Sequence, residues 1–357
     1  MDFTYNFPAV KGIQAGREYY ITMIPLKYLI KLLPESIEYI PPEFRAQRRL
    51  NESRIPEIKS YILDNRDSYI FSSLTVSIDG KFSFLPSKEL ENTGLLKISM
   101  DAKMLINDGQ HRRAAIAQAI VEDETLGEET ISVVLFEDRG LEKSQQMFTD
   151  LNMNAQKSSN SINTCFETRD PLAVLTKNIV KENIFLNKYT DLEKDNLGKN
   201  SSKLFTLYTI FRVNKKIIGN SEVTKNDENF LHLFWNNITN NILEFIELEN
   251  RNITKSILRE EYVLTLGVIL LSFSRVGSWL YQNHVMDMNE YLKGFKTIDW
   301  SRHNSNWYGR IIRENGKIMN NENAVILAGN YLKKCLGIGI SKEEQKREDS
   351  IKNAIKG

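Results

Sequence analysis

Apolar and polar residues along the first half of the chain alternate in the manner of short strands separated by helices. Residues 19–24 are aromatic and β-branched and predict a strand, followed by a short amphipathic helix that ends near Pro34. Pro56 stands where the first turn of a further helix would lie, a position that tolerates its missing N–H. The apolar face of that helix consists of Ile55, Ile58, Ile62 and Leu63.

Further apolar runs predict a sheet in the same half. Strand-like stretches cover residues 69–78, 81–85 and 95–100, and Asp79-Gly80 between the first two predicts a β-hairpin, because Asp-Gly favours tight two-residue turns. Later patterns predict short buried strands at 104–106 and 131–136, and helices at 111–120 and 141–151.

Beyond Asp170-Pro171, which has the form of a helix cap followed by proline, the pattern becomes helical. Helix-like periodicity covers residues 171–185, 201–213, 228–247, 257–282 and 322–336. We therefore predict an α/β (α+β) N-terminal domain over residues 1–165 and a mainly α-helical C-terminal domain over residues 166–357.

The composition argues against a disordered, collagenous or fibrous protein. The 357 residues are 41% hydrophobic and 26% charged, as in ordinary globular proteins, and the formal net charge is +1. A nearly neutral chain does not adsorb tightly to nucleic acid as a whole, so a polyanion must bind at a local patch or pocket.

Cysteine and histidine usage argues against disulfide and metal centres. Cys165 and Cys335 are far apart, without CxxC spacing, and the four histidines are scattered, so no metal site is predicted. Whether either thiol has a redox role stays open. The N-terminus lacks the pattern of a signal peptide, and the apolar stretch at 262–273 is too short to cross a bilayer. These features predict a cytoplasmic protein without membrane association.

The segment Asp108-Gly109-Gln110-His111-Arg112 has the physical properties of an anion site. It follows an apolar strand and opens a helix, whose first N–H groups lack partners inside the helix and carry partial positive charge. Glycine admits a ligand close to the backbone, and arginine offers a planar fork for phosphate. The alternative is an ordinary Asp-Gly turn with a structural histidine and solvated arginines.

This segment, followed by Arg113-Ala114-Ala115, resembles the signature of DGQHR-domain proteins, within the wider ParB/sulfiredoxin-like superfamily. Two other stretches also resemble that group: Met147–Lys157, which reads F-x-D-L-N-x-N-A-x-K, and Gln47-Arg48-Arg49 with Asn51 and Arg54. Residues 200–206, Asp299-Trp300 and Trp307 make the whole chain similar to the DndB family of DNA phosphorothioation (dnd) gene clusters.

The resemblance implies a ParB/sulfiredoxin-like fold for the N-terminal domain and a Gly-x-x-Arg element that contacts nucleotide phosphates. It also implies a bacterial or archaeal accessory protein that regulates modification genes by binding promoter DNA. Sulfiredoxin chemistry is not carried over, because Gln110 and His111 stand where its cysteine would lie. The predicted phosphate- or nucleotide-binding set is Gly109, Gln110, His111, Arg112, Arg113, Asn152, Asn154 and Lys157.

Two basic clusters are candidates for contact with DNA. The first contributes Arg48, Arg49 and Arg54, and the second contributes Arg302, Asn304, Arg310 and Arg313. For the second cluster the alternative is a solvated loop that Trp307 anchors to the helical core.

Three functions are compatible with these residues. The first is a DNA-binding regulator whose partners are double-stranded promoter DNA and other phosphorothioation proteins. The second is a nucleoside triphosphatase or DNA nickase, in which Asp108, His111 and Arg112 are catalytic and a nucleoside triphosphate binds with Mg²⁺. Asp101 and Asp150 are the further carboxylates for that ion. The third is a structural partner of the modification enzymes. The DNA sequence, the nucleotide and any homo-oligomer stay open.

Overall fold

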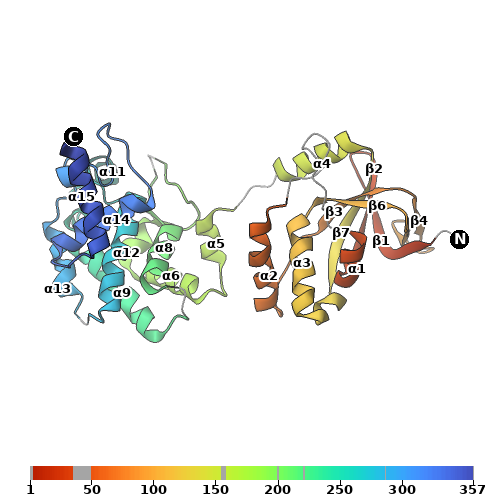
Figure 1. The fold of residues 1–357 in the computed structure, drawn as a ribbon, viewed down its shortest axis with the longest axis horizontal. Coiled ribbons are helices and arrows are strands. Elements are labelled where there is room, and N and C mark those ends of the chain that lie inside the picture. Colours follow the sequence, from red (N-terminus) through yellow and green to blue (C-terminus); the bar gives the residue numbers. More distant parts are fainter. Residues whose placement is uncertain are drawn as a thin grey trace. The chain divides into compact units, whose positions relative to one another are not determined.

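The computed structural model describes residues 3–34, 50–153, 158–198, 201–219, 222–285 and 287–356. The chain forms two units, residues 1–156 and 157–357, each with its own hydrophobic core (Figure 1). The predicted boundary after residue 165 falls within helix α5 (Asn160–Phe166) and stays a prediction.

A seven-stranded sheet forms the centre of the first unit. Its strands are β1 (Thr4–Gln14), β2 (Arg17–Pro25), β3 (Leu74–Asp79), β4 (Phe82–Pro86), β5 (Thr93–Ser99), β6 (Lys103–Asp108) and β7 (Thr130–Glu137). The order is β4-β5-β1-β2-β7-β3-β6, and every neighbouring pair is antiparallel except β3 and β7. The predicted mixture of strands and helices is confirmed.

The predicted hairpin at Asp79-Gly80 is wrong. Strand β3 pairs with β6 and β7, whereas β4 pairs with β5. Residues 74–78 are all buried, which is typical of an interior strand flanked on both sides. Gly80 serves close packing instead: its φ is +136°, and a Cβ there would lie 2.8 Å from the Cα of Ala102. The predicted strand at 69–78 begins only at Leu74, and β1 was not predicted.

Helices complete the core of the first unit. Short helix α1 (Leu26–Leu32), α2 (Ile55–Asp64) and α3 (Gln110–Glu122) contribute buried apolar residues to the same cluster as the strands. Helix α3 packs closely because Ala114, Ala115 and Ala119 are small. Helix α4 (Leu141–Met153) contacts β6 through Met147, whose sulfur lies 3.3 Å from the side-chain amide nitrogen of Asn107.

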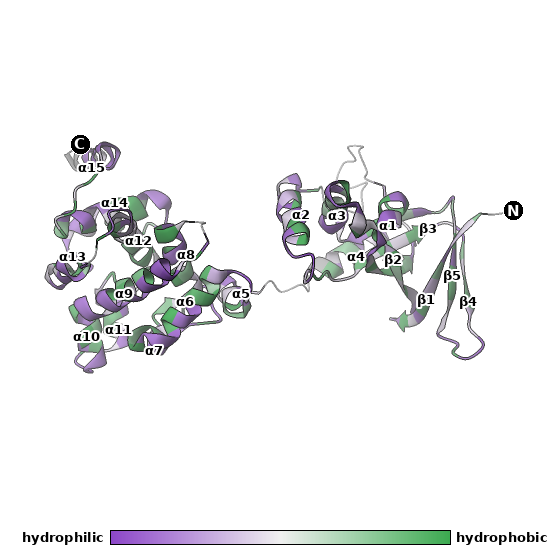
Figure 2. Ribbon diagram, turned by 90° about the horizontal axis from the view of Figure 1, so that it is seen from below, coloured by the Kyte–Doolittle hydropathy of each residue, from purple (hydrophilic) through white to green (hydrophobic). Residues whose placement is uncertain are grey.

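The second unit is built from helices, as predicted. They are α5, α6 (Pro171–Glu182), α7 (Ile184–Tyr189), α8 (Leu207–Ile218), α9 (Lys225–Asn241), α10 (Leu243–Glu249), α11 (Lys255–Glu261), α12 (Gly267–Gln282), α13 (Asn289–Leu292), α14 (Glu322–Cys335) and α15 (Lys342–Lys356). Hydrophobic and hydrophilic residues interchange along them (Figure 2). Mostly buried α12 packs against α8 and α14. Within the described ranges, no helix is long and apolar enough to cross a membrane.

Four predicted helices differ in their limits. The helix predicted at 171–185 is interrupted at Asn183, which ends α6 and caps α7. The helix predicted at 201–213 begins at Leu207, because the Thr206 side chain caps it and Phe205–Thr206 form strand β9, paired with β8 (Thr190–Asp191). The helix predicted at 228–247 is interrupted at Ile242, and the one predicted at 257–282 is interrupted between Glu261 and Gly267. Helix α15 was not predicted.

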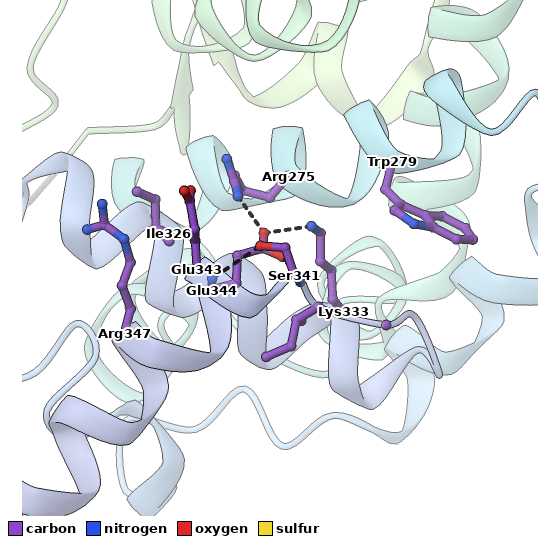
Figure 3. A pocket seen from close by; sticks show the side chains of 10 residues that line it. Arg275, Trp279, Ile326, Lys333, Ser341, Glu343, Glu344 and Arg347 are labelled. Carbon is purple, nitrogen blue, oxygen red and sulfur yellow. Dashed lines mark hydrogen bonds and ion pairs between the residues drawn. The ribbon is translucent and has the colours of Figure 1, made fainter.

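Helix α15 begins with a capping box in which one residue also forms ion pairs. The Glu344 carboxylate accepts from the backbone N–H of Ser341, while the Ser341 hydroxyl accepts from the N–H of Glu344. Glu344 also accepts from Arg275 at 2.5 Å and Lys333 at 2.8 Å (Figure 3). Burial would raise the pKa of Glu344, but hydrogen bonds from Lys333, Ser341 and Arg275 outweigh it and lower the pKa to about 2.

This lowered pKa predicts loss of stability in acid. A carboxyl group whose pKa falls on folding stabilises the native state above its unfolded pKa, near 4.5, and the contribution disappears as pH falls towards 2. Urea unfolding should show Glu344→Gln less stable than wild type at pH 7, with the difference shrinking between pH 4.5 and pH 2. A difference that does not vary with pH would contradict the ion pairs.

Candidate functional site

The predicted strand, glycine turn and helix are present. Strand β6 ends at Asp108, Gly109 adopts φ 104° and ψ 14°, and α3 begins at Gln110. Two constraints require glycine at position 109. L-residues rarely adopt this left-handed backbone, and a Cβ would lie 2.1 Å from the Cδ2 of Leu74, which is fully buried in β3.

The Arg112 side chain folds back over the turn. One terminal nitrogen donates to the carbonyl oxygens of Ser72 at 2.5 Å and Ser73 at 3.1 Å, and the other donates to the Asp108 carboxylate at 2.7 Å. The side chain is only 16% exposed. Arg112 therefore joins the residues before β3 to the end of β6, and its planar fork is occupied by the protein itself.

His111 brings the start of a second helix to this turn. Its Nε2 accepts from the backbone N–H of Asn51 at 3.0 Å, so the ring has a lone pair at Nε2. Asn51 caps the 3₁₀ turn η2 (Glu52–Arg54), which runs directly into α2. Further along, Lys59 in the middle of α2 pairs with Glu122 at the end of α3 at 2.5 Å. The two helices therefore run parallel, side by side (Figure 1), and begin next to each other.

The shared start of these helices is rich in donors. Because Gly109 has no side chain, the cap residue of α3 cannot accept from the first amides of the helix. The side-chain nitrogen of Gln110 is buried and has no hydrogen-bond partner among the described residues. Arg54 on η2 is exposed. Amides, helix dipoles and a nearby guanidinium are the chemistry that binds an anionic oxygen.

Arg113 lies on the inner side of α3, away from these groups. Its guanidinium is buried and donates to the carbonyls of Leu33 at 2.7 Å and Ile30 at 3.1 Å, at the end of α1. These carbonyls belong to the last turn of a helix, where intrahelical partners are lacking. Arg113 therefore ties α1 to α3, and we no longer assign it to the phosphate-binding set.

Some predicted residues fall outside the description. Arg48, Arg49, Asn154 and Lys157 lie outside the described residues, as does the side chain of Asn152.

The acidic residues around the turn have identifiable partners. Asp108 is 45% exposed and accepts from Arg112, and Asp150 on α4 accepts from Gln146 at 2.7 Å. Within the described part of the chain, no three His, Cys, Asp or Glu side chains form a group that could hold a metal ion.

The second predicted DNA-binding cluster lies in the helical unit. Most of its side chains bind other groups of that unit. Arg302 donates to the carbonyls of Arg259 at 2.7 Å and Tyr262 at 3.2 Å, and burial lowers its pKa. Asn304 caps a 3₁₀ turn that carries fully buried Trp307. Arg310 pairs with Glu348 at 2.6 Å. Arg313 is exposed.

Sequence reasoning missed the groups that fix Arg112. Ser72 and Ser73 act mainly through backbone carbonyls, which every residue has, so residue type carries no signal for their role. The capping box at Ser341 and Glu344, by contrast, is a readable S-x-x-E pattern ahead of α15.

The chain matches the family described as DndB, DNA-sulfur modification-associated, over residues 7–339. The match spans nearly the whole chain and both units, so the protein belongs to this family and is associated with a DNA-sulfur modification system. No curated protein and no solved structure is significantly similar to it.

The packing around Gly109 predicts that a methyl group added at this position lowers the stability of the protein. Gly109→Ala combines a strained backbone with a clash against Leu74, and should lower the free energy of unfolding by about 2 kcal/mol or more. Gly140→Ala is a matched control, because Gly140 also has positive φ but a Cβ there would meet nothing within 4 Å. Equal losses in urea unfolding would show that the contact with Leu74 is unimportant.

Arg112→Lys should also be destabilising, although charge is kept. Lysine lacks the planar fork that reaches Asp108, Ser72 and Ser73 together, and each hydrogen bond lost from these partly exposed acceptors costs about 0.5–1.5 kcal/mol. Arg139→Lys, at an exposed pair with Glu137, should change unfolding by less than about 0.5 kcal/mol. Equal stability of the two variants would refute the role of Arg112 as a clamp.

Proposed function

We propose that this protein is a DNA-binding regulatory or accessory component of its DNA-sulfur modification system, and that it holds a backbone phosphate where α2 and α3 begin. The observation that carries the proposal is the hydrogen bond between Asn51 and His111, which keeps the two helix starts together. Each start adds partial positive charge, and both act on the same ligand.

The site residues divide between holding the turn and binding the ligand. Arg112 and Asp108 neutralise each other and keep the turn closed. The first amides of α3, the Gln110 side chain and exposed Arg54 are the donors assigned to phosphate. This assignment differs from a Gly-x-x-Arg site in which the arginine itself grips the ligand.

DNA is favoured over a free nucleotide by the family, whose description refers to modification of DNA. A nucleoside triphosphate with Mg²⁺ offers the same phosphate chemistry and is the alternative ligand for this turn. In an NTPase or nickase, Asp108 would have to share its carboxylate between Arg112 and the ion. Promoter DNA is therefore the first partner to test.

The proposal predicts that the protein prefers its own upstream DNA, and that Arg54 contributes to the affinity. In fluorescence anisotropy, wild type should bind the duplex upstream of its own gene more tightly than a scrambled duplex. Arg54→Ala should weaken binding by roughly 3- to 10-fold and reduce the salt slope by about 1, because one phosphate contact is lost. Arg139→Ala, which removes an exposed arginine elsewhere in the same unit, should bind like wild type.

Other results would contradict particular parts of the proposal. Equal affinity for both duplexes would refute the regulatory role. Normal binding by Arg54→Ala with a loss in Arg313→Ala would move the contact to the helical unit. Competition of ATP, GTP or CTP with DNA at micromolar concentration would favour the nucleotide alternative.

A further inference from the structure

The described part of α15 docks on the helical unit through acidic side chains. Between residues 342 and 350 the two buried side chains are Glu344 and Glu348, four positions apart and therefore on one face of the helix. A helix normally docks through an apolar stripe, but this segment, KEEQKREDS, has no apolar residue. Its described contacts are therefore largely ionic.

Each glutamate bridges two cations that belong to different parts of the unit. Glu344 joins Arg275 of α12 to Lys333 of α14, at 2.5 and 2.8 Å (Figure 3). Glu348, whose side chain is fully buried, joins Arg310 to Lys334 at 2.6 and 3.2 Å. The four cations therefore form a basic surface under α15, which we call the α15 seat.

The carboxylates satisfy the α15 seat incompletely. The Nε–H groups of Arg275 and Arg310 are buried and have no hydrogen-bond partner among the described residues, and one oxygen of Glu348 is also unpartnered. A phosphodiester has two non-bridging oxygens, and arginine can bind them in bidentate fashion through Nε and a terminal nitrogen. The two Nε–H groups that the glutamates leave without a partner are therefore available to a phosphate that binds in this way.

A cavity already opens beside the α15 seat. It has a volume of about 560 Å³, and its lining includes Arg275, Lys333, Arg347 and Trp279 (Figure 3). The Glu343 and Glu344 carboxylates also line the cavity. The three cations and the indole ring are the kinds of side chain that contact phosphates and bases in nucleic-acid complexes. A strand that entered here would meet Glu344 next.

We propose that the α15 seat is a second binding site for the DNA backbone, and that α15 covers it in the free protein, with Glu344 and Glu348 in the place of two phosphates. This inference rests on the proposed function, because it assumes that the protein binds DNA. Arg310 was predicted from the sequence to contact DNA. In this proposal it does so only after α15 has moved away. Buried ion pairs add little net stability over apolar contacts, so an ionic seat can release its helix.

The test compares two charge-matched double variants of the full chain. Glu344→Gln with Glu348→Gln keeps the shape of α15 but weakens its hold on the seat. Glu290→Gln with Asp349→Asn removes the same charge from exposed positions of the helical unit that do not line the cavity. At about 50 mM salt the first variant should bind duplex DNA roughly tenfold more tightly than wild type, and the second within about twofold.

Hydrogen exchange provides a second measurement on unaltered protein, in case the first variant folds poorly. Saturating DNA should accelerate exchange of the backbone amides of residues 345–350, because α15 leaves the seat. Equal affinity of both double variants, or weaker binding by the first, would overturn the inference while the proposed function stands. Unchanged or slower exchange with DNA would overturn it too. Failure of every variant to bind DNA would overturn the proposed function, and this inference with it.

Discussion

The close approach of β3, β6 and α3 depends on Gly109 and on the guanidinium of Arg112. Glycine leaves room for Leu74, and Arg112 donates across that space to Ser72, Ser73 and Asp108. A largely buried guanidinium is costly unless its donors meet acceptors, so the turn and the arginine stabilise each other. Because the fork is thus occupied, backbone amides and the neighbouring helix have to supply the contacts to any anion.

The strand and helix around this turn were predictable because their signals are local. A short apolar run, a glycine and a series of helix formers predict β6 and α3 without reference to other segments. Strand β1 lacks such a signal, since it contains Pro8 and Gly12 and gains its identity from β5 and β2 on either side. The wrong hairpin has the same origin: Asp79-Gly80 indicates a turn, but only distant strands determine which pairs form.

The candidate site was predictable in position but not in the roles of its arginines. Arg112 and Arg113 are neighbours in sequence, yet Arg113 meets the Leu33 carbonyl 80 positions away, and Arg112 meets Ser72, 40 positions away. Arg302 likewise binds backbone carbonyls, whereas Arg54 and Arg313 are exposed. The sequence shows which positions along the chain carry positive charge. Whether a guanidinium faces solvent or a helix end depends on packing between remote segments.

The nearly neutral charge of the chain limits how it can hold a polyanion. With 47 basic and 46 acidic residues, many cations can find an internal carboxylate, as Arg275, Arg310, Lys333 and Lys334 do. Phosphate binding must then use either backbone amides, which need no counter-charge, or cations whose carboxylates move away. Amides bind without rearrangement, so the start of α3 suits a permanent contact. Exchange of carboxylate for phosphate moves a helix, so only the second mode can convert DNA binding into a change of structure.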